Sequence, residues 1–455
     1  MSPMARRIVF NRSSHSSPDS GQLPRAPGLP LVGSLPAVLR QQFDFFDAAR
    51  ERCGSLFEVD FGVTRVVMIA DPKLAQVVWV DRAKNFDKGE EFWDGIRDIL
   101  GNGLPASDGE VWRRSRRLMN PEFRRARIAG FAETIRAGVD EALDELEGPA
   151  KRGETLEASA WTSTLLSVLT VRLLLGSEFD TSRMENIQVA LRALLDNTLA
   201  GVVTRKLPSW IPVPGTGELE DALKTIDEVI YAAIADHRRN PSESRSLLGM
   251  LIEATDSDPE FSDQQLRDEA MGIYLAGYET TAWTLAWALY LLSQHPDIVR
   301  ELQAEADATD NPMQSPLLSA TIDEVTRLYP SAPFLPRRAV VDEELAGYPI
   351  PQGTTVAVSP WLIQRNPAFW PDPQRFDPRR HLGEHPERPK LALCPFGAGK
   401  RICIGKGLAM IEAHTTLHRL LRRFTPQPGD GPRSVPALST TLRSRDGIRV
   451  RLEAR

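Results

Sequence analysis

The sequence predicts a mainly α-helical fold with small β-sheets and one long central helix. Most of residues 110–328 place apolar side chains at helical spacing. Residues 57–60 instead alternate between apolar and polar side chains, and residues 65–69 run from Arg65 through four apolar residues, two of them β-branched valines, which together predict an early β-hairpin over residues 56–60 and 65–69. A length of 455 residues would by itself suggest two or three domains, but no Gly/Ser-rich linker or break in composition divides the chain after residue 35.

The longest predicted helix begins near Ser262, whose hydroxyl can cap the first turn together with Gln265. From Met271 to Ser293 it is apolar and carries one charge, so length alone would fit a membrane span. That charge, Glu279, lies near the middle, where insertion into a membrane costs about 2.5 to 3.5 kcal/mol. A helix that is apolar on nearly every side except for one polar notch is typical of a buried core. We therefore predict a buried central helix and no membrane anchor.

The N-terminal residues 1–18 contain three arginines, five serines and no acidic residue. This composition is typical of a transit peptide and equally of a disordered tail. The apolar run of residues 8–10 is too short for a secretory signal or a membrane anchor. Three cysteines in 455 residues are typical of a reducing compartment. We expect residues 1–21 to be a disordered tail and the protein to be cytoplasmic, with an organelle as the alternative.

A glycine-rich loop near the C-terminus brings Cys403 to the start of a predicted helix. Apolar residues recur at helical spacing from Gly405 onward, so the positive end of that helix faces the cysteine. Unpaired backbone N–H groups at the helix start, together with Lys400, Arg401 and Lys406, favour the thiolate form. Such a thiolate can bind a metal. The alternative is an ordinary small buried cysteine.

Zinc is disfavoured as that metal, because structural zinc sites use four ligands in closely spaced pairs. Cys394 and Cys403 have no second pair to complete such a site. A single axial thiolate indicates heme iron instead. The stretch from Phe396 to Gly405, Phe-Gly-Ala-Gly-Lys-Arg-Ile-Cys-Ile-Gly, resembles the heme-binding motif of the cytochrome P450 family.

Three further segments strengthen this resemblance, which covers roughly residues 22–453. They are Trp112-x-x-x-Arg116, Ala276-Gly277-Tyr278-Glu279-Thr280-Thr281 and Glu324-x-x-Arg327. The resemblance implies one large, mostly helical unit over residues 22–455 that binds heme b. It also implies a heme-thiolate monooxygenase that inserts one oxygen atom from O2 into an apolar small molecule, such as a fatty acid, a terpenoid or another secondary metabolite.

The resemblance gives these positions roles around the heme. Cys403 becomes the iron ligand, and Glu279 and Thr280 become the acid and alcohol that supply protons during oxygen activation. Thr280 could instead bond back to a carbonyl of its own helix. The remaining positions would bind the cofactor or its propionates: Trp112, Arg116, Ala276, Arg337, Phe396, Gly397, Arg401 and Gly405.

Glu324 and Arg327 are predicted to be structural. In the family such a pair is buried and joined by an arginine, which Pro373-Gln374-Arg375-Phe376 supplies here as Arg375. The histidines receive no role: we interpret His381 as an ordinary residue of a proline-rich loop, and His414 and His418 as part of a solvated helix face.

Substrate contacts are expected from residues 86–104, 195–214 and 331–335, and from Ala276 and Thr280. The aromatic side chains there suggest an apolar ligand, although aromatic residues in loops also serve packing. The predicted pocket residues are Phe86, Phe92, Trp93, Ala276 and Phe334.

The helix that carries Trp112 also holds the strongest charge cluster, in a chain with a formal net charge of −6. No aromatic-interleaved or zinc-finger pattern accompanies it, so nucleic-acid binding is disfavoured. We interpret the cluster as a docking surface for an acidic ferredoxin- or flavodoxin-type electron donor with its reductase, and a solvated helix face is the alternative. The residues expected to matter most are Arg113, Arg117 and Lys406.

Two other classes of function remain open. A peroxygenase or isomerase of the same family could dispense with the Glu279–Thr280 pair, so the presence of that pair favours a monooxygenase. A non-catalytic heme-thiolate binding protein would need an output module, and the sequence shows none. We expect a monomer whose partners are the electron donor, O2 and an apolar substrate.

Overall fold

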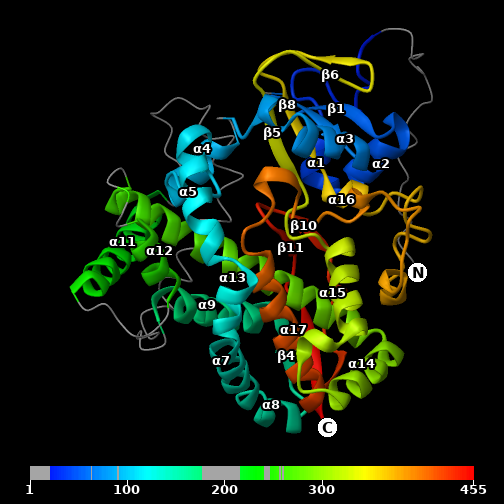
Figure 1. Ribbon diagram of the computed structural model, residues 1–455. Helices are drawn as coiled ribbons and strands as arrows, with labels where there is room; N and C mark the ends of the chain where they lie inside the picture. The colour runs from blue at the N-terminus through cyan, green and yellow to red at the C-terminus, as the bar shows by residue number, and fades with distance from the viewer. Residues whose placement is uncertain are drawn as a thin grey trace.

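The computed structural model describes residues 21–62, 64–89, 92–176, 216–239, 246–255, 258 and 261–455. As predicted, these residues form mostly helices together with small sheets (Figure 1). The largest sheet lies at the top of the view beside the first helices, and most of the other helices lie below it. Residues 1–20 of the tail expected over residues 1–21, and the substrate segment 195–214, lie outside the described residues.

The predicted central helix is α13 (Asp263–Ser293), which spans 31 residues. The Ser262 side chain accepts a hydrogen bond from the Gln265 backbone N–H, as the capping pattern predicts. Most of its side chains are buried, including Leu285, Trp287 and Leu292. The prediction of a buried central helix is therefore confirmed.

The other helices surround α13 or cover the largest sheet (Figure 1). Their bounds are α1 Leu35–Gln41, α2 Phe43–Cys53, α3 Pro72–Gln76, α4 Trp93–Leu100, α5 Gly109–Glu122, α6 Arg125–Ile128, α7 Ala132–Asp144, α8 Glu147–Lys151, α9 Ala158–Leu175, α11 Thr216–Arg239, α12 Leu247–Thr255, α14 Pro296–Ala308, α15 Pro316–Leu328, α16 Pro360–Ile363 and α17 Lys406–Arg423. Short π or 3-10 segments are η2 Val77–Asp81, η3 Ala83–Asn85, η4 Ala129–Phe131, η6 Pro312–Gln314, η7 Pro378–His381, η8 Lys390–Ala392 and η9 Gly399–Arg401.

The largest sheet has the strand order β1-β2-β8-β5-β3. β1 and β2 form the predicted hairpin, with Leu56 opposite Ile69 and Asp60 opposite Arg65. β2 pairs with β8 in parallel, and the remaining pairs are antiparallel. The bounds are β1 Leu56–Asp60, β2 Arg65–Ile69, β3 Phe86–Asp87, β5 Leu335–Ala339 and β8 Thr355–Val358.

Smaller sheets join segments that are distant in sequence. One has the order β4-β12-β9, and two are hairpins, β10-β11 and β6-β7. The bounds are β4 Thr155–Glu157, β6 Glu343–Leu345, β7 Tyr348–Ile350, β9 Phe424–Pro428, β10 Pro436–Leu438, β11 Leu442–Ser444 and β12 Arg449–Ala454.

Two described hydrophobic clusters hold these elements together. The larger includes side chains from Ala26 to Leu452, and the smaller packs against the largest sheet. One described helix, α9, is apolar and long enough to cross a membrane, but 61% of it is buried inside the protein, where it contacts α13 and α7. That degree of burial is typical of a core helix.

Candidate active site

Cys403 lies just before the first turn of α17, which begins at Lys406 with Gly405 as its N-cap residue. The backbone N–H groups of Gly405 and Lys406 donate hydrogen bonds to its sulfur. The backbone N–H of Cys403 in turn donates to the carbonyl of Phe396, at 3.0 Å, which closes the loop. The predicted arrangement of a cysteine at the start of a helix is therefore observed.

Gly399 lets this loop lie against η2. Its φ of +68° falls in the left-handed region, and a Cβ built on it would be 2.0 Å from the carbonyl oxygen of Trp79. Only glycine tolerates both the conformation and the contact without a shift of the backbone. The sequence places a glycine here because the loop must approach η2 this closely.

The sulfur of Cys403 opens into an internal cavity of about 320 Å³ between α13, α5 and the cysteine loop. Burial raises the pKa of its thiol, while the N–H groups of Gly405 and Lys406 and the charge of Arg116 act in the opposite direction. An apolar cavity alone would keep the thiol protonated. A cation bound to the sulfur would complete the stabilisation of the thiolate that these groups begin.

The opposite wall of the cavity is the polar notch of α13. Ala276, Gly277, Thr280 and Thr281 all line the cavity. The Thr280 hydroxyl donates to the carbonyl of Ala276 at 2.8 Å, which is the back-bonded arrangement that sequence reasoning left open. Small residues therefore leave space facing Cys403, and a hydroxyl stands at the edge of that space.

Glu279 does not join Thr280 in the cavity wall. Neighbouring residues on a helix point about 100° apart, and Glu279 is directed toward β11. Its Oε1 accepts hydrogen bonds from Thr441 Oγ1 at 2.8 Å and from Arg443 Nε at 2.9 Å, and its side chain is buried. The two groups expected to act as an acid–alcohol pair are thus held apart by an ion pair that sequence reasoning missed.

The predicted propionate-binding residues Trp112, Arg116, Arg337 and Arg401 all line the cavity. The Arg401 guanidinium lies 4.3 Å above the ring of Trp112 and also pairs with Asp108. Arg337, rather than its neighbour in sequence at position 338, is the one that faces the cavity. Burial, followed by the nearby charge of Arg401, lowers its pKa to about 10.

Lys88 is a fifth polar group of this wall and was missed by sequence reasoning. It lines the cavity, and its Nζ lies 3.7 Å from the ring of Trp93. Burial and the charges of Arg337 and Arg401 lower its pKa well below the usual value. No sequence motif marks it, and only its place within residues 86–104 could have pointed to it. So many desolvated cations in one wall fit a ligand that carries carboxylates.

Glu412 of α17 is a second cavity residue that sequence reasoning missed. It is only 2% exposed and accepts a hydrogen bond from the Thr281 side chain. Burial raises its pKa to about 8, so the carboxyl group is mostly protonated at neutral pH. The cavity can therefore contain Glu412 without containing a second negative charge beside the thiolate.

Comparison with known proteins identifies the family of this chain. The family model described as Cytochrome P450 matches residues 23–450. The chain belongs to the cytochrome P450 family. The crystal structure of a cytochrome P450DA heme domain superposes with a TM-score of 0.84 at 25% sequence identity, covering 95% of this chain and 98% of that one.

Several relatives come from Streptomyces. A pentalenene oxygenase of Streptomyces avermitilis is 32% identical over 94% of this chain and 97% of its own length. A cyclooctat-9-en-7-ol 5-monooxygenase of Streptomyces melanosporofaciens is 31% identical over 89% of this chain and 90% of its own length. Protein LUTEIN DEFICIENT 5, chloroplastic, of Arabidopsis thaliana is 28% identical over 88% of this chain and 72% of its own.

This P450 is a monooxygenase whose cofactor is heme b. The observed residues fit that group: Cys403 would hold the iron, the cationic wall would hold the two propionates, and Phe396, Gly397, Ala276 and Gly405 all line the space between. When bound, the heme supplies the oxygen-activating chemistry, and its thiolate ligand favours O–O cleavage.

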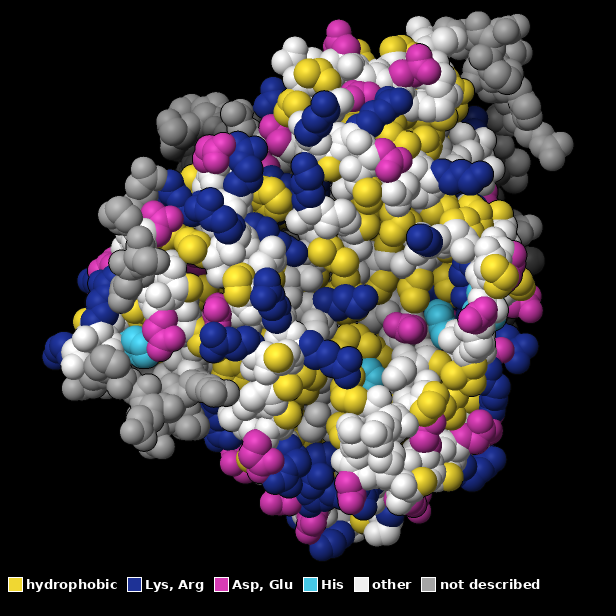
Figure 2. Space-filling view, in the orientation of Figure 1, with side chains coloured by type: hydrophobic (Ala, Val, Ile, Leu, Met, Phe, Trp, Pro, Cys, Tyr) yellow, Lys and Arg dark blue, Asp and Glu magenta, His cyan; other side chains and the backbone are white. Residues whose placement is uncertain are grey.

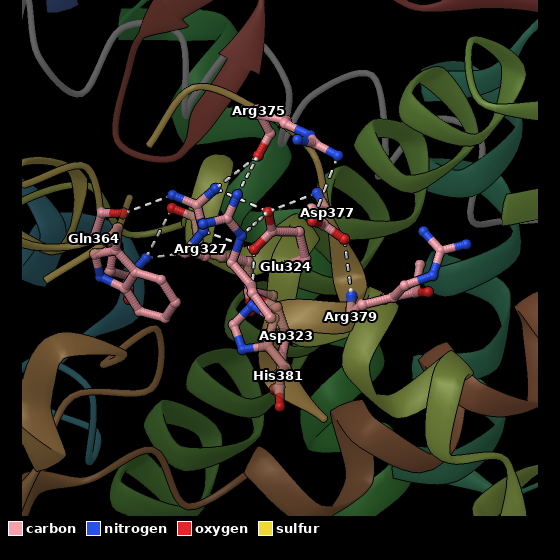
Figure 3. Close-up of polar contacts among 12 residues, drawn as sticks. Asp323, Glu324, Arg327, Gln364, Arg375, Asp377, Arg379 and His381 are labelled. Carbon is pink, nitrogen blue, oxygen red and sulfur yellow. Dashed lines mark hydrogen bonds and ion pairs between the residues drawn. The ribbon is translucent and has the colours of Figure 1, made fainter. Parts of the chain in front are cut away.

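The Glu324–Arg327 pair of this P450 is fully buried, as predicted (Figure 3). Arg327 Nε and Nη2 donate to the two carboxylate oxygens of Glu324 at 2.7 and 2.9 Å. Burial alone would raise the pKa of Glu324, but the hydrogen bonds from Arg327 and His381 outweigh it and lower the pKa. Arg327 also donates to the carbonyl oxygens of Gln364 and Pro373, which ties α15 to the segments after α16.

The prediction that Arg375 joins this pair is wrong. Its side chain is 67% exposed and points toward Asp377, and only its carbonyl oxygen meets Arg327 (Figure 3). Arg380 takes the expected place, with Nε 3.1 Å from Glu324. His381 Nε2 lies 2.7 Å from the same carboxylate and is buried, so it is no ordinary loop residue. The sequence repeats Pro-x-Arg at residues 373–375 and 378–380, and the later copy is the one that folds inward.

Three of the five predicted substrate-pocket residues lie elsewhere. Trp93 and Ala276 line the cavity as expected. Phe334 instead packs against Phe43 and Phe46. Phe92 packs against Trp93 and the larger hydrophobic cluster. Phe86 belongs to the smaller cluster, which packs against the largest sheet. The aromatic side chains are mostly packing residues. His414 and His418 are also buried, in contrast to the solvated face expected for them.

Proposed function

We propose that this P450 hydroxylates or epoxidises an apolar, terpenoid-sized molecule. The observation that supports the proposal is the composition of the cavity above Cys403. Much of its wall is formed by apolar side chains and small residues, namely Trp93, Leu104, Pro105, Gly272, Ile273, Ala332 and Leu335. The names of two relatives, which specify pentalenene and cyclooctat-9-en-7-ol, support the same class of substrate.

In this proposal the residues of the chain divide the work by position. The apolar wall excludes water and holds the substrate by contact area rather than by hydrogen bonds. Thr280 presents its hydroxyl at the cavity edge, where it would supply protons to the chemistry of the heme when that group is bound. Glu279 can take part in proton transfer only after its carboxylate leaves Arg443 and contacts a group that carries a proton. The ion pair with Arg443 would therefore limit the supply of protons.

We expect Thr280→Ala to separate electron consumption from product formation. Without the hydroxyl, protons reach the site through water, so electrons drain into hydrogen peroxide and product per electron falls by about tenfold or more. Peroxide and product are quantified against reductant consumed. Thr280→Ser, which keeps the hydroxyl, should remain coupled. Equal coupling in wild type and Thr280→Ala would show that the hydroxyl has no part in proton transfer.

The substrate class is tested by optical titration of the purified protein. A cyclic terpenoid that enters the cavity and displaces water from the iron should shift the Soret band at micromolar concentration. Ala276→Leu narrows the cavity and should abolish this shift, while the much smaller carbon monoxide molecule still binds and gives the wild-type spectrum. A clear response to straight-chain fatty acids with none to cyclic terpenoids would reject the terpenoid assignment.

We further propose that electrons come from a separate acidic protein of the ferredoxin or flavodoxin type. Arg113, Arg117 and Lys406 are exposed on α5 and the first turn of α17, next to the cysteine loop. Figure 2 shows Lys and Arg side chains across the middle of this face, where α5 and α17 lie in Figure 1. Charge complementarity would speed the encounter without tight binding.

The same proposal describes a monomer located in the cytoplasm. An organelle is the alternative, and its support is the name of the Arabidopsis thaliana relative, which places that protein in the chloroplast. The residues that would decide between them, 1–20, lie outside the described part of the chain.

A further inference from the structure

The loop between α4 and α5 is fastened to α13 by two adjacent acidic residues. The backbone N–H of Asn102 donates to Asp268 Oδ2 at 2.8 Å, and the N–H of Leu104 donates to Glu269 Oε2 at 2.8 Å. Asp268 is 4% exposed and Glu269 is fully buried. Neither residue belongs to the heme-binding or proton-transfer motifs, and no sequence observation singled them out.

Both acids are held in place by other residues, so they form a fixed frame for the loop. Gln265 Nε2 donates to Glu269 Oε1 at 2.8 Å and to the carbonyl of Asn102 at 3.2 Å. Arg267 pairs with Asp268 at 3.2 Å and with Asp227 of α11 at 2.6 Å. The loop therefore meets carboxylates whose positions α13 and α11 have already set.

The loop backbone lies directly on α13. A Cβ built on Gly103 would be 2.4 Å from the carbonyl oxygen of Asp268, so the contact has no room for a side chain. Leu104 and Pro105, which follow at once, line the cavity, as does Glu269 itself. Any movement of the loop away from α13 would change the width of the cavity at this wall.

We propose that Asp268 and Glu269 are positioning residues that set the shape of the substrate pocket by holding Leu104 and Pro105 against α13. The inference rests on the proposed function only in treating this cavity as the substrate pocket. Burial also raises the pKa of Glu269, and its proximity to Asp268 adds to the rise. Burying carboxylates costs free energy, and a loop that only faces water has no need of them. A loop that forms one wall of a ligand pocket is held at a fixed position by hydrogen bonds to buried carboxylates.

The proposal is tested with two iron-binding probes of different size, imidazole and 4-phenylimidazole, titrated optically. Imidazole occupies only the space at the iron, while the phenyl ring extends toward the walls. In Glu269→Ala the Leu104 N–H loses its partner, so the ratio of the two dissociation constants should shift by about tenfold. In Glu269→Gln the amide oxygen can still accept that hydrogen bond, so the ratio should return to the wild-type value.

The matched control is Asp263→Asn, on the same helix. Asp263 pairs with Arg238 at the surface, so its loss should leave the ratio unchanged. An unchanged ratio in Glu269→Ala, or an equal loss of affinity for both probes, would overturn the proposal.

Hydrogen exchange of the wild-type holoprotein tests the same proposal without a variant. The Asn102 and Leu104 amides should be protected from exchange, and rapid exchange at both would also overturn the proposal. Neither probe is a terpenoid, so these results do not depend on the proposed substrate class.

Discussion

Cys403→Ser abolishes the red-shifted Soret band of the reduced, carbon monoxide-bound protein and brings substrate turnover to background. The hydroxyl of serine is a far weaker donor to iron than a thiolate. The Gly405 and Lys406 N–H groups at the start of α17 favour an anion, but a serine hydroxyl stays protonated there whereas a cysteine thiol can ionise. The readouts are the carbon monoxide difference spectrum and product formation, both normalised to heme content.

The matched control for this change is Cys53→Ser. The Cys53 thiol donates to the carbonyl of Arg25 at 3.3 Å, a bond that serine can keep, and it lies outside the residues lining the cavity. Its spectrum and turnover should equal those of wild type. A red-shifted band that survives in Cys403→Ser would mean that another group supplies the thiolate.

Glu324→Gln destabilises the protein by about 3–5 kcal/mol, because it leaves the Arg327 guanidinium buried without its counter-charge. Both side chains are fully buried, and Arg380 and His381 would also lose their shared partner. Urea unfolding of the holoprotein, followed by circular dichroism and by the heme absorbance, should show a lower midpoint by both probes.

Arg375→Ala is the control, since sequence reasoning assigned Arg375 to this cluster and the structure places its side chain in solvent. Its unfolding free energy should stay within about 0.5 kcal/mol of wild type, while Arg380→Ala should fall between the two. If Arg375→Ala were as destabilising as Glu324→Gln, the Arg375 side chain rather than that of Arg380 would be the partner of the buried pair.

Sequence reasoning succeeded where a feature depends on residues close together in the chain. The cap at Ser262, the hairpin from Leu56 to Ile69 and the position of Cys403 before α17 all follow from local spacing. Local hydrogen bonds and helix starts obey rules that act over three or four residues, so the sequence alone predicts them.

Sequence reasoning failed where two nearby candidates compete for one distant partner. Arg375 and Arg380 both follow a proline by two residues, and only the path of the chain beyond α16 decides which side chain reaches Glu324. The aromatic residues of the expected pocket failed for the same reason. An aromatic side chain packs equally well in a core or around a ligand, so its neighbours decide its role.

The sequence by itself therefore determined the family and the cofactor and predicted Cys403 as the iron ligand, because one short motif with the right glycines and cations is specific enough to carry these inferences. Only the tertiary structure decided the surroundings of that ligand. It turned Glu279 toward Arg443, brought Lys88 to the cationic wall and buried Glu412 in the cavity wall, which raises the pKa of that carboxyl group. Burial and contacts between distant segments set the charge state and the direction of a buried polar group. The spacing of residues along the chain predicts neither burial nor these contacts.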